Sequence, residues 1–570
     1  MKITRTITRY LLAAMMMMAA TGALRAAEIH CGRVVVFTDR DIYIAGEQLL
    51  FTLHINGESG GQTSASGEIV YLLLRDSRQG PVAKVCMKTA GGMAYGSISL
   101  PDTLATGYYQ LVAFTNRLRN CGEDCYFSKE LIIANLFDRE LKALSDANPA
   151  QVTAEGPVVD KMQQPAQSLF SIRGLKKTYA QGEEISFSLA GNSSSGNLPA
   201  ITVSVAEEEP WQGKISGYNF GQSCSSRSTQ MEFLPETRGQ IISGKVTDKA
   251  THAGIENCCV LLSAKDTAVN LQYAFTGSNG MFRFRLNDYY QQKDIVIQLL
   301  DSVPGQKPVI ELEDRFALSD AFVPAAGGIS AAVAEYIRRS QDIVRVQRAY
   351  RQAPQMQAVE KTAGNNLRPA LYYKPDQQVF PGAYESLSDF SEITKELLPT
   401  VRTRKTASGT TLEVVDKVQQ GFFSKNAALF IDGIYRRDNR EVLPMGSDRI
   451  RRIEVVNEQR VYGTLTFPGI LAVFTNDSAI APATDQSSKL FRVEPYSANS
   501  VQQQQEIPRN TTLPDFRQLL YWQPVIKAGQ AGSYDIKFRA SQHTGTFILS
   551  IRGTGADGEI IQKEQRFSIR

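Results

Sequence analysis

The chain has 570 residues, of which 42% are hydrophobic and 21% charged, and its 62 basic residues outnumber its 58 acidic residues by four. Four basic residues, Lys2, Arg5, Arg9 and Arg25, lie in the first 26 positions, so the remainder has no net charge. Such a chain has no basic field to attract nucleic acid or anionic lipid, and its length exceeds what one hydrophobic core supports. We therefore expect several domains and no nucleic-acid partner.

Residues 1–26 have the pattern of a signal peptide. Basic residues precede an apolar run from Tyr10 to Leu24, and the small residues Ala26 and Ala27 follow it. The run is too short for a membrane span, and cleavage is expected near Ala26. We expect an exported protein with no membrane span beyond the signal peptide.

Seven cysteines are present, and an odd number in an exported chain leaves at least one without an intramolecular partner. The sequence does not decide their pairing, although Cys121 with Cys125 and Cys31 with Cys86 are candidate pairs. Cys258 and Cys259 are adjacent in a predicted strand, so their side chains point to opposite faces, and both are interpreted as small buried hydrophobic residues. The seven are Cys31, Cys86, Cys121, Cys125, Cys224, Cys258 and Cys259.

Short runs of Val, Ile, Phe and Tyr, broken by Gly, Asn, Asp and Pro, predict a mainly β chain. In the first block, residues 27–140, turns at Ala45-Gly46-Glu47 and Leu100-Pro101-Asp102 precede strands, the second of them from Gly107 to Thr115. This block resembles the MG2 β-sandwich of the α2-macroglobulin superfamily. Its Cys121-Gly-Glu-Asp124 differs by one residue from the superfamily's thioester motif, but the final Asp is not the amide which that chemistry uses. A thioester is therefore not expected.

Residues 165–220 are predicted to form a second sandwich. Their segment Tyr179-Ala-Gln-Gly182-Glu183 repeats the segment Tyr43-Ile-Ala-Gly46-Glu47 of the first block. The repeat predicts the same strand-turn-strand unit twice, with glycine supplying the positive φ of the turn. This second block is also macroglobulin-like, and the polar stretch 143–167 is interpreted as a linker.

The next block, residues 240–312, contains Gly244-Lys-Val246 with Asp248, then Gly254-Ile255, then a run from Thr276 to Phe284. These marks resemble the carboxypeptidase regulatory-like domain, a small β-sandwich that precedes the plug in many TonB-dependent receptors of Bacteroidetes. Its Asn279-Gly280 pair predicts a hairpin. The resemblance implies no peptidase residues.

Two helices are predicted. Ser330 caps a helical connector, residues 328–353, and Asp389, three residues before Glu392, caps a helix from Ser386 to Leu398. The apolar stripe of the connector is formed by Val333, Tyr336, Ile337, Ile343 and Val344. Its arginines, which we interpret as a solvated face with an acidic partner as the alternative, are Arg338 and Arg345 opposite the stripe and Arg339 and Arg348 at its edges.

Within residues 365–478, Leu429-Phe-Ile431 precedes Asp432-Gly433, a strand-like run covers Ile450 to Val456, and Tyr462-Gly463 precedes the run from Gly469 to Thr475. This pattern resembles the plug domain of TonB-dependent outer-membrane receptors, with departures at Arg451, Arg452 and Pro468. Only 94 residues follow Asn476, too few for a receptor barrel of about twenty-two strands, and no TonB box is visible. Active transport is not expected, and Asp432, Gly433 and Tyr462 are interpreted as turn and core positions rather than contacts.

Residues 513–570 are predicted to form a final macroglobulin-like sandwich. Apolar residues alternate in Tyr534-Ile-Asp-Ile-Lys-Phe538 and in Phe547-Ile-Leu-Ser-Ile551. Trp522 is interpreted as a core anchor, with an exposed ligand platform as the alternative.

No catalytic constellation is visible in the sequence. The four histidines, His30, His54, His252 and His543, form no pair at helical metal-ligand spacing, and neither a G-x-S-x-G elbow nor a Walker A loop occurs. We expect no catalytic residue, cofactor or metal, and the sequence does not identify binding residues.

The predicted fold is mainly β, a string of Ig-like or macroglobulin-like sandwiches with one small α+β plug-like domain and a few helices. The resemblances imply a non-enzymatic scaffold of the Gram-negative envelope, periplasmic or associated with the outer membrane, that binds an envelope protein by strand addition. The alternatives are an accessory ligand-binding subunit of a TonB-dependent nutrient-uptake system and, less favoured, a macroglobulin-like protease trap.

Overall fold

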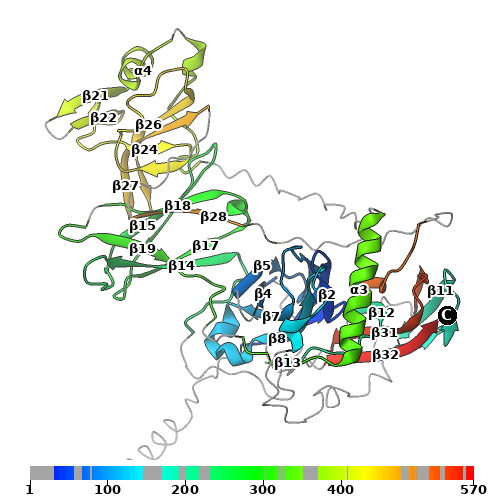
Figure 1. The fold of residues 1–570 in the computed structure, drawn as a ribbon. Helices are drawn as coiled ribbons and strands as arrows, with labels where there is room; N and C mark the ends of the chain where they lie inside the picture. The colour runs from blue at the N-terminus through cyan, green and yellow to red at the C-terminus, as the bar shows by residue number, and fades with distance from the viewer. Residues whose placement is uncertain are drawn as a thin grey trace, which may run out of the picture. The chain divides into compact units, whose positions relative to one another are not determined.

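The chain forms two compact units, each built mostly of strands, as predicted (Figure 1). Unit 1 comprises residues 1–237, 318–360 and 497–570, and unit 2 comprises residues 238–317 and 361–496. The predicted signal peptide, Cys224 and most of the predicted linker 143–167 lie outside the described residues. The computed structural model describes residues 31–56, 67–76, 80–145, 170–191, 200–216, 231–301, 303–318, 322–324, 328–350, 370–384, 386–406, 409–476, 487–494, 496, 513–526, 533–555 and 560–570.

The first sandwich of unit 1 follows the predicted block closely. The turn at Gly46 separates β2 (Ile42–Ile44) from β3 (Gln48–Asn56), and β7 (Gly107–Thr115) covers the predicted strand. Strand β8 (Phe127–Ala134) follows two short 3-10 helices, η1 (Arg117–Cys121) and η2 (Glu123–Cys125), and precedes α2 (Lys142–Ser145). One sheet contains β1 (Arg33–Thr38), β3 (Gln48–Asn56) and β6 (Met93–Ser99). The other has the order β13 (Ile215–Ser216), β8 (Phe127–Ala134), β7 (Gly107–Thr115), β4 (Ile69–Asp76) and β5 (Gly80–Lys88), with β2 (Ile42–Ile44) parallel to β8.

The ranges 165–220 and 513–570, predicted as two sandwiches, build one sandwich together. Val205 of β12 (Ile201–Glu207) pairs with Leu549 of β31 (Gly545–Thr554) and with Tyr521 of β29 (Leu519–Ile526), so one sheet contains strands from both ranges. Neither range supplies enough apolar strands to close a core alone, and buried residues of both fill a shared one. One sheet has the order β10 (Thr178–Tyr179), β32 (Ile560–Ile569), β31 (Gly545–Thr554), β12 (Ile201–Glu207) and β29 (Leu519–Ile526); the other has β30 (Ser533–Arg539), β11 (Glu184–Gly191) and β9 (Phe170–Arg173).

Helix α3 (Ala331–Ala349) begins where the sequence predicts. The Ser330 hydroxyl accepts a hydrogen bond from Val333 N, and all five residues of the predicted stripe are buried. The stripe packs against Ile42, Ile132 and other apolar residues of the first sandwich. The helix ends at Ala349, before the predicted Ala353.

Unit 2 begins with the sandwich predicted from residues 240–312, which is completed by a strand from much later in the chain. The residues Asn279-Gly280 form a turn, but β16 and β17 beside it belong to opposite sheets, so the predicted hairpin is wrong. A side chain at Gly280 would collide with the Val246 carbonyl, which explains the glycine there. One sheet has the order β17 (Met281–Leu286), β14 (Gln240–Asp248) and β19 (Pro308–Leu312); the other has β16 (Leu271–Phe275), β15 (Cys259–Ala264), β18 (Asp294–Leu299) and β28 (Ser488–Arg492), and η6 (Asp288–Tyr290) precedes β18.

The described residues between 370 and 476 form the other part of unit 2, which we call the plug-like part after the resemblance noted in its sequence. It contains the predicted strands and turns. Asp389 caps α4 (Phe390–Leu397) by accepting a hydrogen bond from Glu392 N at 3.0 Å. One face of its main sheet shares an apolar core with β15 and β16 of the sandwich. The main sheet has the order β20 (Gln377–Val379), β26 (Ile450–Tyr462), β27 (Leu465–Thr475), β24 (Ala428–Ile431) and β25 (Ile434–Arg436). A smaller sheet contains β21 (Val401–Thr406), β22 (Gly409–Asp416) and β23 (Gly421–Phe422), and η7 (Pro381–Ala383) follows β20.

The two units are nested in the chain. The chain leaves unit 1 after Thr237, returns at Leu318 to form α3, leaves again after Glu360, and returns at Ser497 to complete the second sandwich. Separately, no helix among the described residues is long and apolar enough to span a membrane.

We expect cleavage between residues 497 and 512 to leave both fragments associated, because β29 and β31 are bonded along β12. A site for a specific protease inserted there would give two bands on a denaturing gel but one peak in size exclusion. The same site inserted before Cys31 serves as the control for cleavage itself. Separation of residues 513–570 under native conditions would contradict the shared sandwich.

Candidate functional site

The repeated segment forms the same hydrogen-bonded turn in both sandwiches of unit 1. In the first copy, Glu47 accepts a hydrogen bond from Ile44 N at 2.6 Å, and Tyr43 Oη accepts one from Arg40 N at 3.2 Å. Arg40 also forms an ion pair with Glu47 at 3.1 Å. The turn delivers β2 to its parallel position beside β8, and Gly46 has a φ of 92°.

The second copy reproduces each of these contacts. Glu183 accepts from Ala180 N at 2.7 Å, Tyr179 Oη accepts from Lys176 N at 2.7 Å, and Lys176 pairs with Glu183 at 2.8 Å. This copy places β10 parallel to β32. The predicted repeat is confirmed, but the cation three residues before each tyrosine was missed. That spacing was visible in the sequence as Arg40 to Tyr43 and Lys176 to Tyr179.

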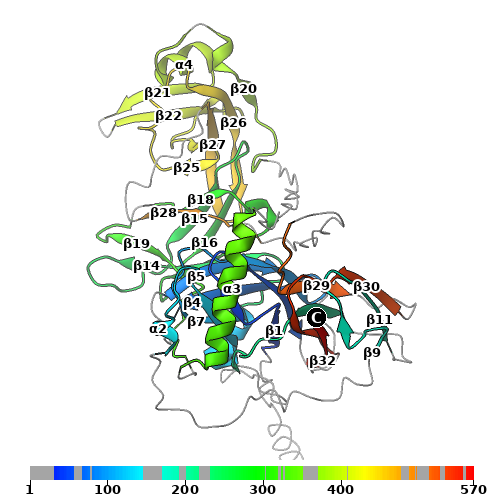
Figure 2. The same ribbon diagram turned by 45° about the vertical axis from the view of Figure 1, so that its right-hand side comes forward.

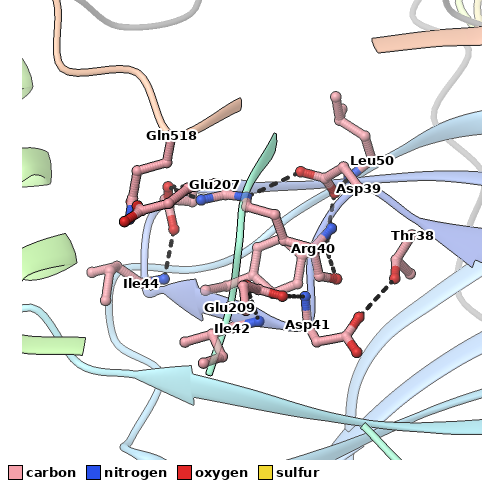
Figure 3. A network of polar contacts seen from close by, with 12 residues as sticks. Thr38, Asp39, Arg40, Asp41, Ile42, Ile44, Leu50, Glu207, Glu209 and Gln518 are labelled. Atoms are coloured by element: carbon pink, nitrogen blue, oxygen red, sulfur yellow. Dashed lines mark hydrogen bonds and ion pairs between the residues drawn. The ribbon is translucent and has the colours of Figure 1, made fainter. Parts of the chain in front are cut away.

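The two copies differ in their surroundings. Lys176 is 64% exposed, whereas Arg40 is only 8% exposed. Arg40 lies where the first sandwich meets the second, and it interacts electrostatically with Tyr336 of α3. Figure 3 shows the Arg40 side chain among the carboxylates of this interface, with Asp39 at 3.2 Å. Burial raises the pKa of Asp39, although Arg40, Tyr43 and Leu50 N–H oppose that shift. We call the charged side chains gathered here, namely Asp39, Arg40, Asp41, Glu47, Lys129, Glu207, Glu209 and Arg339, the polar interface.

Glu209, which follows β12, binds the backbone of the first sandwich. Its carboxylate accepts hydrogen bonds from Asp41 N at 2.8 Å and from Ile42 N at 2.9 Å (Figure 3). Asp41 in turn pairs with Lys129 and accepts from Gly213 N at 2.8 Å. Burial, with the neighbouring Asp41 carboxylate, raises the pKa of Glu209 to about 8.

Glu207, at the end of β12, joins three elements. Its carboxylate pairs with Arg339 of α3, lies 3.0 Å from His543 Nε2, and accepts from Gln518 Nε2 at 2.7 Å. Gln518 also donates to the Ser340 hydroxyl of α3 at 2.9 Å. Glu207 therefore connects α3 to two loops of the second sandwich.

We expect Glu207→Ala to loosen α3, because it removes the carboxylate that binds Arg339 and Gln518. Breaking a largely buried pair costs about 3–5 kcal/mol, which we reduce to about 2–3 kcal/mol because Arg339 is 46% exposed. Hydrogen exchange of residues 331–349 should accelerate, and the matched control is Glu335→Ala on the exposed side of α3. Unchanged exchange in Glu207→Ala would show that the apolar stripe alone holds the helix.

The four arginines of α3 lie on a largely exposed face, as interpreted, and each of them also contacts this chain. Arg348 pairs with Asp102 and donates to Ala45 O at 3.0 Å, and Arg345 donates to Leu136 O at 2.7 Å. Arg338 donates to Arg139 O at 3.3 Å, and Arg339 reaches Glu207. These acceptors lie far away in the sequence, so the helix pattern alone could not reveal them.

A cavity of about 110 Å³ lies between the two sandwiches, lined by the polar interface without Glu47 and Arg339 and by apolar residues such as Phe37, Phe127 and Ile548. Its volume would hold a few water molecules. Most of the charged groups around it form ion pairs, and the carboxylate of Glu209 accepts backbone hydrogen bonds instead. The described residues contain no group of three His, Cys, Asp or Glu placed to hold a metal ion. The arrangement is that of an intramolecular docking surface.

His54 also bridges the two sandwiches. Its Nδ1 lies 3.0 Å from the Thr554 hydroxyl of β31, and the residue is 2% exposed. Burial lowers the pKa of His54 to about 4. The imidazole is therefore neutral at pH 7.

The motif residues of the plug-like part are structural, as interpreted. Asp432 accepts from Thr475 N at 2.8 Å and from its hydroxyl at 2.7 Å, which fixes the end of β27. Gly433 has a φ of 81° in the turn that follows. Tyr462 donates to Leu271 O at 2.9 Å and so joins the plug-like part to the sandwich of unit 2.

Cys31 is disulfide-bonded to Cys121, so both candidate pairs, Cys121 with Cys125 and Cys31 with Cys86, were wrong. The link joins residues 90 positions apart, which local spacing does not reveal. Cys258 packs in the sandwich core, and Cys259 packs on the opposite side against the plug-like part, as their adjacency predicts. Trp522 is 5% exposed, which confirms a buried position and excludes the exposed platform.

No known family model matches the sequence, and no curated protein matches it. Similar solved structures include Salmonella α2-macroglobulin, 9% identical over 95% of this chain with a TM-score of 0.24. The elastase-activated α2-macroglobulin of Escherichia coli is 9% identical over 94% of the chain with a TM-score of 0.23. This chain spans 40% and 44% of the length of those two proteins. The adhesin InvE of Yersinia pseudotuberculosis is 10% identical over 49% of this chain and 58% of its own, with a TM-score of 0.12. Similarity at this level assigns neither a family nor a function.

Proposed function

We propose that this chain is a non-enzymatic binding scaffold of the Gram-negative envelope, in the periplasm or at the outer membrane. Residues 1–26 act as the signal peptide for its export, and the protein acts through contacts with another envelope protein. The MG2-like, regulatory-like and plug-like identities of its modules belong to this proposal, together with an origin in Bacteroidetes.

The exposed aromatic residues of the plug-like part support the proposal most directly. Tyr373, Phe380 and Tyr384 are 84%, 51% and 59% exposed and lie within twelve residues of one another in the chain. Aromatic side chains are enriched in protein–protein interfaces, where they supply large contact areas. The apolar core shared with the unit 2 sandwich gives them a rigid support.

The pairing of the polar interface supports a scaffold over an enzyme. Glu207 pairs with Arg339 of α3, and Glu209 accepts hydrogen bonds from two backbone N–H groups of the first sandwich, as expected of groups that hold modules together. Charges used in this way stabilise one arrangement of the two sandwiches and α3.

The test is a crosslinking pulldown of the tagged protein from intact envelopes, with fractionation into periplasm and outer membrane. We expect one envelope protein at near-equal amount, and at least a tenfold loss in a triple variant with Tyr373→Ser, Phe380→Ser and Tyr384→Ser. The matched control is Phe137→Ser, which changes an aromatic residue of unit 1 that is 77% exposed. Recovery of no partner would overturn the proposal, and a thermal shift with a glycan or peptide would then favour the accessory subunit.

A further inference from the structure

The strand β21 is an edge strand, and its outer side differs from those of β29 and β17 because no described residue is hydrogen-bonded to the outward main-chain groups of Thr403 and Lys405. It lies at one end of the small sheet with β22 and β23, and both views draw the β21–β22 hairpin projecting from the rest of its unit (Figure 1, Figure 2). By comparison, edge strand β29 contains Pro524, whose carbonyl accepts from the Thr52 hydroxyl at 3.4 Å. The edge of β17 is partly covered because Gln272 donates to Arg285 O at 3.0 Å.

The alternation of hydrogen bonds between β21 and β22 shows which main-chain groups of β21 point away from β22. Val415 N donates to Thr400 O at 2.9 Å, and the register pairs Val401 with Val414. Because bonded and non-bonded pairs alternate along antiparallel strands, the N–H and C=O groups of Thr403 and Lys405 point away from β22. No described residue is hydrogen-bonded to those groups.

The charged side chains of β21 are all positive. Arg402, Arg404 and Lys405 lie within six residues that contain no acid, and the cross-strand Glu413 pairs with both arginines. Arg402 and Arg404 remain 46% and 62% exposed. Pairing β21 with the same strand of a second copy would bring cations together, which opposes self-association.

We propose that the outer edge of β21 takes an extended acidic segment of a partner protein as an additional strand. Main-chain bonds would form at Thr403 and Lys405, and acidic side chains at alternate positions would face Arg402 and Arg404. This inference rests on the proposed function and names the surface and the chemistry of its partner.

The probe is a strand-forming peptide that alternates Glu with Thr, compared with its Lys counterpart, titrated into the full chain. We expect the acidic peptide to bind at least tenfold more tightly. Lys405→Pro, which removes an outward N–H, should weaken binding at least tenfold, whereas Lys405→Ala should weaken it about threefold. Arg404→Glu keeps the outward N–H groups and should reduce the preference for the acidic peptide, because Arg404 lies on the face that the acidic side chains would meet.

Three outcomes would overturn the inference. In the first, neither peptide binds the full chain. In the second, Lys405→Pro and Lys405→Ala weaken peptide binding equally. In the third, sedimentation shows that the wild type is a dimer and that Lys405→Pro abolishes the dimer. Circular dichroism melts establish that each variant is folded, and Arg404→Glu provides the test if Lys405→Pro is not. In the envelope pulldown, equal partner recovery by Lys405→Pro and wild type would reject β21 while the scaffold function stands. No recovery by wild type would reject the function itself.

Discussion

Replacing Arg40 by methionine is expected to destabilise unit 1 by about 3–5 kcal/mol, because it leaves the buried Asp39 and the largely buried Glu47 without their cation. Methionine fills a similar volume, so the loss arises from charge rather than from a cavity. The two tryptophans of the chain, Trp211 and Trp522, both lie in unit 1. Denaturant unfolding followed by tryptophan fluorescence therefore reports on this unit.

The chain supplies its own control for Arg40. Lys176→Met removes the equivalent cation from the second copy of the turn, where the ion pair is exposed and solvent replaces the lost partner. We expect its unfolding midpoint to stay close to that of the wild type. Equal shifts of the unfolding midpoint in Arg40→Met and Lys176→Met would show that the loss of stability arises from the turn rather than from the buried interface.

We expect acid to weaken unit 1 through His54. In the folded protein the imidazole stays neutral down to its pKa of about 4, whereas in the unfolded chain it takes up a proton below about pH 6.5. The unfolded state then binds more protons, so the free energy of unfolding falls as the pH decreases from 6.5 to 4. The full difference is about 3 kcal/mol at 1.36 kcal/mol per pKa unit.

His54→Gln isolates this contribution, because glutamine is neutral at every pH and can still reach Thr554. Between pH 7 and pH 4.5, the free energy of unfolding measured by tryptophan fluorescence should fall in the wild type relative to the variant. The opposite trend is expected from Glu209, whose raised pKa lowers stability as the pH rises from 4.5 to 8. A constant difference between variant and wild type would show that His54 does not titrate with unfolding.

Local features were predictable from the sequence because neighbouring residues determine them. The Tyr-x-x-Gly-Glu turn depends on contacts within eight residues, and the caps at Ser330 and Asp389 depend on contacts three residues away. The strands of the plug-like part follow from alternation and from turn residues such as Gly433.

Partners distant in the chain were not predictable in the same way. A strand pattern at β12 shows that one face is apolar but does not reveal whether its neighbour is local or far along the chain. For that reason residues 165–220 and 513–570 were interpreted as separate domains. The same limit applies to Glu207, whose partners Arg339 and Gln518 come from two distant segments.

The nested order of the units also affects how the chain folds. Thr202 and Pro524, which are hydrogen-bonded in the second sandwich, are 322 residues apart in the sequence. During synthesis β12 is made long before its neighbours β29 and β31, so its apolar face has no sheet partner while the intervening segments emerge. Contacts of such high sequence separation form slowly and leave unpaired strands prone to aggregation. We therefore expect the second sandwich to form late, and early folding of unit 2 would shorten the loop that this step has to close.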